Sequence, residues 1–113
     1  MADIIYVDQE DGKKRVMNNG KLYAKLLGKF RDETKLEPIF AALDAGNYEE
    51  AQGQAHTIKG ITANLSIKDL NEKIVELEAQ IKAKSVDPQI IETVKVSFAN
   101  TLPEVEKVIA ENA

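Results

Sequence analysis

The sequence predicts an all-α protein: an antiparallel four-helix bundle preceded by a short N-terminal helix. Two observations carry this prediction. Apolar residues recur every three or four positions nearly throughout the chain, which is the spacing that places them on one face of a helix. The segments with this spacing are long and are separated by short connections, and such connections join antiparallel neighbours in helical bundles. No stretch shows strong alternation of apolar and polar residues, the pattern of a half-buried strand.

The first half of the chain contains two helical segments. Asp8 and the polar residues after it predict the start of a short helix that ends near Met17. A longer apolar stripe then runs over residues 22–43 and stops at an Asp-Ala-Gly-Asn turn. Pro38 lies within this stripe, and we expect it to kink or split the helix because proline lacks a backbone donor and crowds the preceding turn.

The second half contains three further helical segments, over residues 48–66, over residues 68–84, and from Pro88 onward. Pro88 suits the first position of a helix, where the missing N–H has no partner in any case. Pro103 interrupts the last segment and predicts a bend there.

Composition limits the classes of function. The chain has 113 residues, enough for one domain over residues 1–113, with a lead at 1–17 and a bundle at 20–111. The net charge of −4 disfavours a nucleic-acid binder, and the absence of cysteine excludes a disulfide or a Cys-based zinc site. Residues 1–6 show no secretory signal and no apolar run could span a bilayer, so we expect a stand-alone cytoplasmic monomer without membrane contact.

His56 is the only histidine of the chain. At about 100° per residue it lies roughly 140° from the centre of its helix's apolar stripe, so we expect it to face solvent. Lys59 and Gly60 follow one turn later, at the spacing of helical neighbours. Gly53 and Gly60 each cost about 0.5–1 kcal/mol inside a helix; they either leave bare backbone for an approaching macromolecule or permit close helix packing. A nucleophile, a cation and a residue without a side chain on one helix face predict a phosphate carrier.

The sequence around this histidine resembles a known signature. Histidine-containing phosphotransfer (HPt) domains carry the pattern A-H-x-L-K-G-x-x-x-x-L/V. The resemblance covers about residues 15–84, including the upstream apolar helix, the turn at 43–48 and the Leu77-Glu78 pair. The matching run is Ala55-His56-Thr57-Ile58-Lys59-Gly60-Ile61-Thr62-Ala63-Asn64-Leu65.

The resemblance implies a phosphorelay intermediate that carries a phosphoryl group between aspartates of receiver domains, in a hybrid histidine kinase or a response regulator. His56 would be the phosphorylated nucleophile, Lys59 would stabilise the phosphoryl charge, and Gly60 would give steric access. Glu78 would accept a hydrogen bond from Nδ1 and leave Nε2 to attack, or it is a plain surface acid.

Two positions depart from the family pattern. Ser66 stands where glycine is common, which changes the end of the helix. Ile61 stands where a small residue is usual, and with Gly53 and Ala63 it is expected to form a docking patch for the partner. The chain lacks a nucleotide-binding loop, paired catalytic carboxylates and a metal-ligand pattern. We therefore expect no cofactor, no metal and no autonomous enzyme activity, with the receiver supplying the catalytic apparatus.

Three alternatives remain at this level. The first is a helical bundle that docks a receiver or kinase as an adaptor without being phosphorylated, since folds outlive functions. The second is an unrelated structural bundle in which His56 is incidental. The third is an autonomous enzyme, which lacks a visible second catalytic group.

Overall fold

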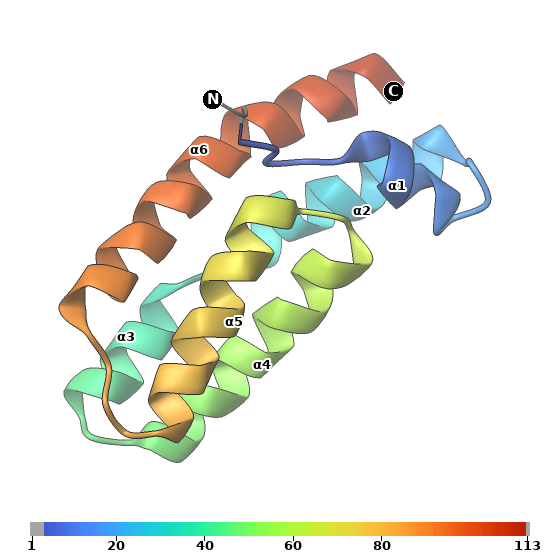
Figure 1. Ribbon diagram of the computed structural model, residues 1–113. Helices are drawn as coiled ribbons and strands as arrows, with labels where there is room; N and C mark the ends of the chain where they lie inside the picture. The colour runs from blue at the N-terminus through green and yellow to red at the C-terminus, as the bar shows by residue number, and fades with distance from the viewer. Residues whose placement is uncertain (1–3, 113) are drawn as a thin grey trace.

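Helices account for most of the computed structural model, which describes residues 4–112 (Figure 1). Residues 1–3 and 113 lie outside the described residues. The predicted lead at residues 1–17, and residues 1–6 within it, are therefore described only in part. The all-helical fold class is confirmed. In chain order the helices are α1 (Gln9–Lys14), α2 (Gly20–Glu33), α3 (Glu37–Asp44), α4 (Tyr48–Asn64), α5 (Lys68–Lys82) and α6 (Pro88–Asn112).

Short polar side chains cap four of the helices at their N-termini. Such a cap stabilises a helix by about 1 kcal/mol, because it satisfies a backbone donor without a partner inside the helix. The predicted helix start at Asp8 is among them and is confirmed. The caps are Asp8 for α1, Asn19 for α2, Asn47 for α4 and Asp87 for α6, with bonds of 3.1, 3.0, 3.1 and 2.9 Å from the backbone of Asp11, Leu22, Glu50 and Gln89.

Three helices end two or three residues earlier than the apolar pattern predicts. The reason is the backbone at Met17, Ser66 and Lys84, whose φ angles of 58°, 56° and 55° lie in the left-handed region. A right-handed helix cannot continue through such a residue. Glycine adopts this conformation without strain, which explains its frequency at the position of Ser66 in the family that the sequence resembles.

The two internal prolines behave differently from each other. The segment over residues 22–43 is split, but at residues 34–36 and not at the proline itself, because Pro38 lies in the first turn of α3. There its missing N–H costs no helical hydrogen bond. Pro103, by contrast, lies inside α6, which runs unbroken from Pro88 to Asn112.

The helices enclose one apolar core. α4 packs against α3 and α5, and α6 packs against α2 and α5 (Figure 1). Among the described residues, every buried side-chain nitrogen and oxygen has a hydrogen-bond partner. Large core side chains come from α2 to α6 and include Tyr23, Leu27, Ile39, Ile74 and Val94.

Tyr23 links α2 to the end of α4 and to α1. Its hydroxyl donates a 2.6 Å hydrogen bond to the carbonyl of Leu65. A Cβ placed on Gly12 of α1 would lie 2.4 Å from the Tyr23 ring, so α1 reaches this position only because residue 12 has no side chain. The short first helix is therefore fitted closely against α2.

Residues 4–8 form an extended N-terminal strap beside the junction of α4 and α5 (Figure 1). The carbonyls of Ile5 and Tyr6 accept hydrogen bonds from the backbone of Asp69 and Lys68, at 3.2 and 3.0 Å. These N–H groups begin α5 and have no partner inside that helix. The strap therefore caps α5.

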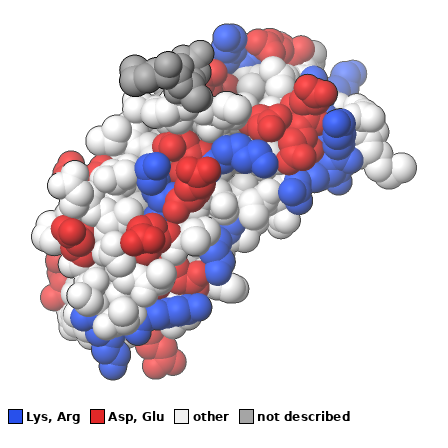
Figure 2. Space-filling view, viewed as in Figure 1, with Lys and Arg blue, Asp and Glu red and all other residues white. Residues whose placement is uncertain are grey.

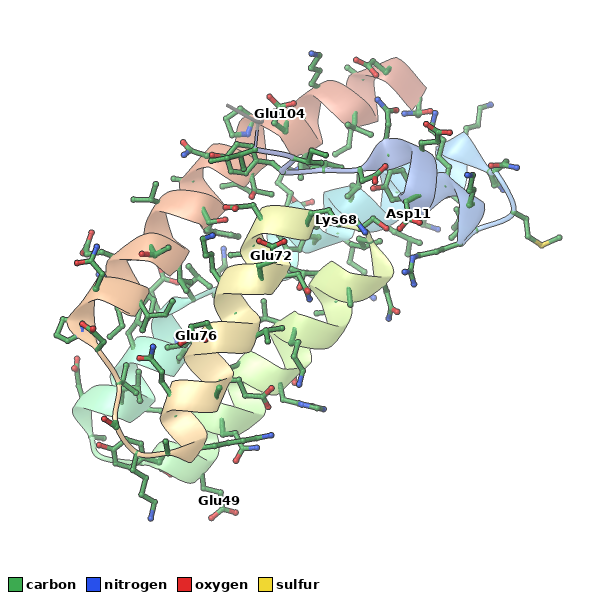
Figure 3. All side chains as sticks on the ribbon, in the orientation of Figure 1. Asp11, Glu49, Lys68, Glu72, Glu76 and Glu104 are labelled. Atoms are coloured by element: carbon green, nitrogen blue, oxygen red, sulfur yellow. The ribbon has the colours of Figure 1, made fainter. Side chains whose placement is uncertain are left out.

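Side chains of α1 reinforce this junction. Asp11 accepts a hydrogen bond from the hydroxyl of Ser66, which follows the end of α4. The Asp11 carboxylate also lies 3.6 Å from the ammonium of Lys68, the first residue of α5 (Figure 3). Together, the strap and α1 fix the end of α4 to the start of α5.

Charges of both signs interleave on the surface seen in Figure 2. Within residues 4–112, no helix combines the length and the apolar character needed to cross a membrane.

Candidate functional site

His56 lies near the middle of α4, on its solvent side. The opposite side of the helix is buried and carries Ala51, Ala55, Ile58 and Thr62. The imidazole is 68% exposed. A large macromolecule can therefore reach the ring without any change in the core.

Glu78 of α5 connects the imidazole to a lysine. Its Oε2 lies 3.1 Å from Nδ1 of His56, and its Oε1 lies 2.5 Å from Nζ of Lys59. The glutamate side chain is only 3% exposed, whereas Lys59 is 31% exposed. Glu78 is therefore a buried carboxylate whose two oxygens each hold one polar group of α4, and it is not a plain surface acid.

Electrostatics keep this carboxylate ionised. Burial raises the pKa of Glu78, but the hydrogen bonds from Lys59 and His56 and the nearby charges of Lys59 and Lys82 outweigh it, so the pKa lies below its ordinary value. An ionised carboxylate only accepts hydrogen bonds. The proton of a neutral His56 ring therefore belongs on Nδ1, which leaves a lone pair on Nε2. Within the described residues Nε2 makes no hydrogen bond.

Asn71 of α5 is a supporting residue that the sequence did not reveal. Its side-chain amide donates to the carbonyl of Lys59 at 3.0 Å and to the hydroxyl of Thr62 at 3.1 Å. Asn71 thereby ties the turn of α4 that follows His56 to the helix that carries Glu78. A polar residue near the start of an amphipathic helix is too common a pattern to have signalled this role.

Gly53 and Gly60 flank His56 in open surroundings. A Cβ added to either glycine would find no atom within 4 Å outside its own helix. Close helix packing therefore does not explain them. Their helical backbone is also compatible with alanine, since neither has a positive φ. They leave bare backbone before and after the imidazole on the exposed face.

The other two residues predicted to dock a partner point in different directions. Ala63 is exposed and lies two turns after His56 on nearly the same side of α4, about 10 Å along the helix. Ile61 is 36% exposed but lies about 140° around the helix from His56. The structure therefore does not bring Ile61 and His56 together in one patch.

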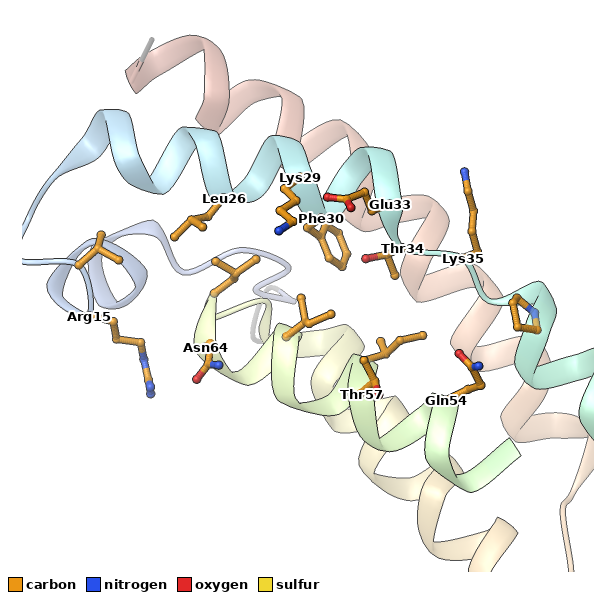
Figure 4. Close-up of a pocket in the computed structure, with 15 residues that line it drawn as sticks. Arg15, Leu26, Lys29, Phe30, Glu33, Thr34, Lys35, Gln54, Thr57 and Asn64 are labelled. Atoms are coloured by element: carbon orange, nitrogen blue, oxygen red, sulfur yellow. The ribbon is translucent and has the colours of Figure 1, made fainter. Parts of the chain in front are cut away.

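Ile61 instead faces a groove between α2 and α4 (Figure 4). This α2–α4 groove has a volume of about 860 Å³, and its rim includes Lys29, Glu33, Gln54 and Thr57. His56 does not line it. Seen around α4, Gly53 and Gly60 lie between the groove and the imidazole. The apolar lining consists mainly of Leu26, Phe30, Pro38, Ile58, Ile61 and Leu65.

Within residues 4–112, no group of three or more histidine, aspartate or glutamate side chains is arranged to hold a metal ion. Comparison of the chain with models of known protein families, with curated proteins and with solved structures finds no match.

Proposed function

We propose that this chain is a histidine phosphotransfer protein of the HPt type, which carries a phosphoryl group on His56 between aspartates of receiver domains in a cytoplasmic two-component phosphorelay. One observation carries the proposal: an exposed imidazole is oriented through Nδ1 by a buried carboxylate, with Nε2 free and a lysine one turn away. This arrangement suits a nucleophile that meets its substrate on the surface of another protein.

The chemistry follows from the geometry. The lone pair of Nε2 attacks the phosphorus of an aspartyl phosphate on the partner, and the Nε2–P bond forms as the bond from phosphorus to the aspartate oxygen breaks. The electron pair of the broken bond remains on the aspartate carboxylate. Lys59 is a helical neighbour of His56 and stabilises the phosphoryl oxygens. Phosphoryl transfer depends mainly on positioning and charge stabilisation, which these side chains supply.

The partner docks across α4 in this proposal. Gly53 and Gly60 leave the backbone bare around His56, so the rim of a receiver's active site can approach the imidazole. The α2–α4 groove lies beyond the glycines and offers apolar surface, including Ile61, to the same partner. Apolar surface of this kind is typical of protein interaction sites.

We also propose a finer description of the fold, in which α2 with α3, α4, α5 and α6 form a monomeric, antiparallel four-helix bundle. The pairing of α4 with α5, of α5 with α6 and of α6 with α2 supports this description. So does the short connection between α4 and α5, because such connections join antiparallel neighbours.

Phosphate transfer from a phosphorylated receiver domain tests the function. We expect the wild-type chain to acquire an acid-labile, base-stable label, and His56→Gln to acquire none while remaining folded. Glu104→Gln is the control, because Glu104 is exposed on α6 and lines neither the α2–α4 groove nor the surroundings of the imidazole. Label on the His56→Gln variant would refute the assignment of the phosphorylated residue.

The α2–α4 groove favours a second candidate, an adaptor that docks a receiver or kinase without carrying phosphate. The groove does not include His56, so docking alone needs neither the imidazole nor Lys59. The same assay separates the two candidates. Binding of a receiver without any transfer, undiminished in His56→Gln, is the result expected of the adaptor.

A further inference from the structure

Glu78 contacts the nitrogen of His56 that does not react, and this contact has a consequence for the phosphorylated state. We infer that Glu78 holds a proton on Nδ1 while Nε2 carries the phosphoryl group, and thereby keeps that group transferable. The inference rests on the proposed phosphorylation of His56 and concerns the step in which the group leaves.

Departure of the phosphoryl group breaks the Nε2–P bond. The electron pair of that bond stays on Nε2, while a carboxylate oxygen of the acceptor aspartate forms a new bond to phosphorus. If Nδ1 bears a proton, the leaving group is a neutral imidazole. If Nδ1 has lost its proton, the leaving group is an imidazolate anion, which is a far stronger base and leaves poorly. The Nδ1 proton therefore stays in place through both transfers, and no separate acid or base is required.

The phosphorylated ring with a proton on Nδ1 carries a positive charge on the imidazole. An opposite charge close by favours such a charged form. Oε2 of Glu78 supplies it at 3.1 Å from Nδ1, from a side chain that is only 3% exposed and hence weakly screened by water. A glutamine at this position would still accept the hydrogen bond but would not bring the charge.

Two cations act on the same carboxylate. Lys59 of α4 lies 2.5 Å from Oε1 of Glu78, and Lys82 of α5 acts on it through its charge. A phosphoryl group on Nε2 brings nearly two negative charges within reach of Lys59. Lys59 then turns from Glu78 toward the phosphoryl oxygens, and the imidazolium becomes the only cation in direct contact with the carboxylate. Phosphorylation itself thus strengthens the hold of Glu78 on the Nδ1 proton.

The test titrates the phosphorylated ring without any receiver. The chain is phosphorylated on His56 with phosphoramidate, and the pH midpoint at which Nδ1 loses its proton is followed by phosphorus NMR. We expect the midpoint of Glu78→Gln to lie about one pH unit below that of the wild type. Spontaneous loss of phosphate above both midpoints is then about tenfold slower in the variant, because about tenfold fewer of its rings are protonated.

Glu76→Gln is the matched control, because it removes the same charge from the exposed side of α5 (Figure 3). We expect the control to leave the midpoint unchanged. Equal midpoints for the wild type and Glu78→Gln, or equal shifts in both variants, overturn the inference. So does failure of phosphoramidate to label a ring with a free Nε2.

Two further results complete the test. If Glu78→Gln does not fold, Lys82→Met takes its place. Because this variant removes a cation that acts on Glu78, we expect it to raise the pH midpoint of the phosphorylated ring. An unchanged or lower midpoint overturns the inference. If the midpoints are as expected but no receiver domain transfers phosphate to the chain, the role of Glu78 is supported and the proposed function is rejected.

Discussion

Replacing Gly53 or Gly60 by alanine is expected to make the protein more stable. Both residues lie inside α4, where glycine is less favourable than alanine by about 0.5–1 kcal/mol. The added methyl groups meet no atom within 4 Å outside their own helix, so no packing cost opposes this gain. The two sites lie about 10 Å apart along the helix and their effects should add, giving about 1–2 kcal/mol for the double variant.

Thermal unfolding followed by circular dichroism measures this gain. For a domain of 113 residues, 1 kcal/mol corresponds to roughly 4–5 °C in Tm. The double variant should therefore melt about 4–10 °C above the wild type. Gly12→Ala serves as the contrasting control, because its Cβ would lie 2.4 Å from the ring of Tyr23 and should lower Tm.

The same variants test the proposed access to His56. Each alanine places a methyl group on the bare backbone beside the imidazole, so transfer from a receiver should slow although the protein has become more stable. A fall in Tm for Gly53→Ala and Gly60→Ala would refute the argument that both added methyl groups fit without a packing cost. A higher Tm with unchanged transfer would instead reject the role of the glycines in partner access.

Substitutions at three other positions give distinct results. Because Glu78 has a lowered pKa in the folded state, it adds stability above the pKa of the unfolded chain, and this stability is lost as the pH falls below about 4.3. Lys59→Met should cost about 1–2 kcal/mol at pH 7 and weaken that acid dependence, as measured by urea unfolding between pH 3 and 7; an unchanged pH dependence would contradict the ion pair. Tyr23→Phe should cost about 1–3 kcal/mol in urea unfolding, because the buried carbonyl of Leu65 loses its donor. Ser66→Gly should remain within about 1 kcal/mol of the wild type, since relief of the positive φ offsets the lost hydroxyl bond, whereas Ser66→Ala should be about 1 kcal/mol less stable. Equal Tm values for the two Ser66 variants would contradict this account.

Features that depend on one helix at a time could be predicted from the sequence. The all-helical class and the exposure of His56 both follow from apolar spacing within single segments. The break before Pro38 was anticipated, though displaced by a few residues, because proline fits the first turn of a helix better than its middle.

Features that depend on how helices pack could not be predicted in the same way. The burial of Glu78 and its pairing with Lys59 require the register between α4 and α5, which neither helix specifies alone. The contact of Asn71 with the backbone of α4 has the same origin. Ile61 was expected to form a docking patch with Gly53 and Ala63. The structure shows that it lines the groove between α2 and α4, and this groove depends on how the two helices pack.

The N-terminal strap bears on how the chain folds as it is synthesised. Tyr6 leaves the ribosome long before Lys68, the residue whose N–H its carbonyl accepts. The side-chain amide of Gln9 donates a hydrogen bond to Glu111, which is synthesised 102 residues later, so this contact forms later still. Contacts between such distant positions close large loops and slow folding relative to purely local helix pairing. The packed pair of α4 and α5, which carries His56, can therefore form first, and the hydrogen bonds from the strap to its junction form late in folding.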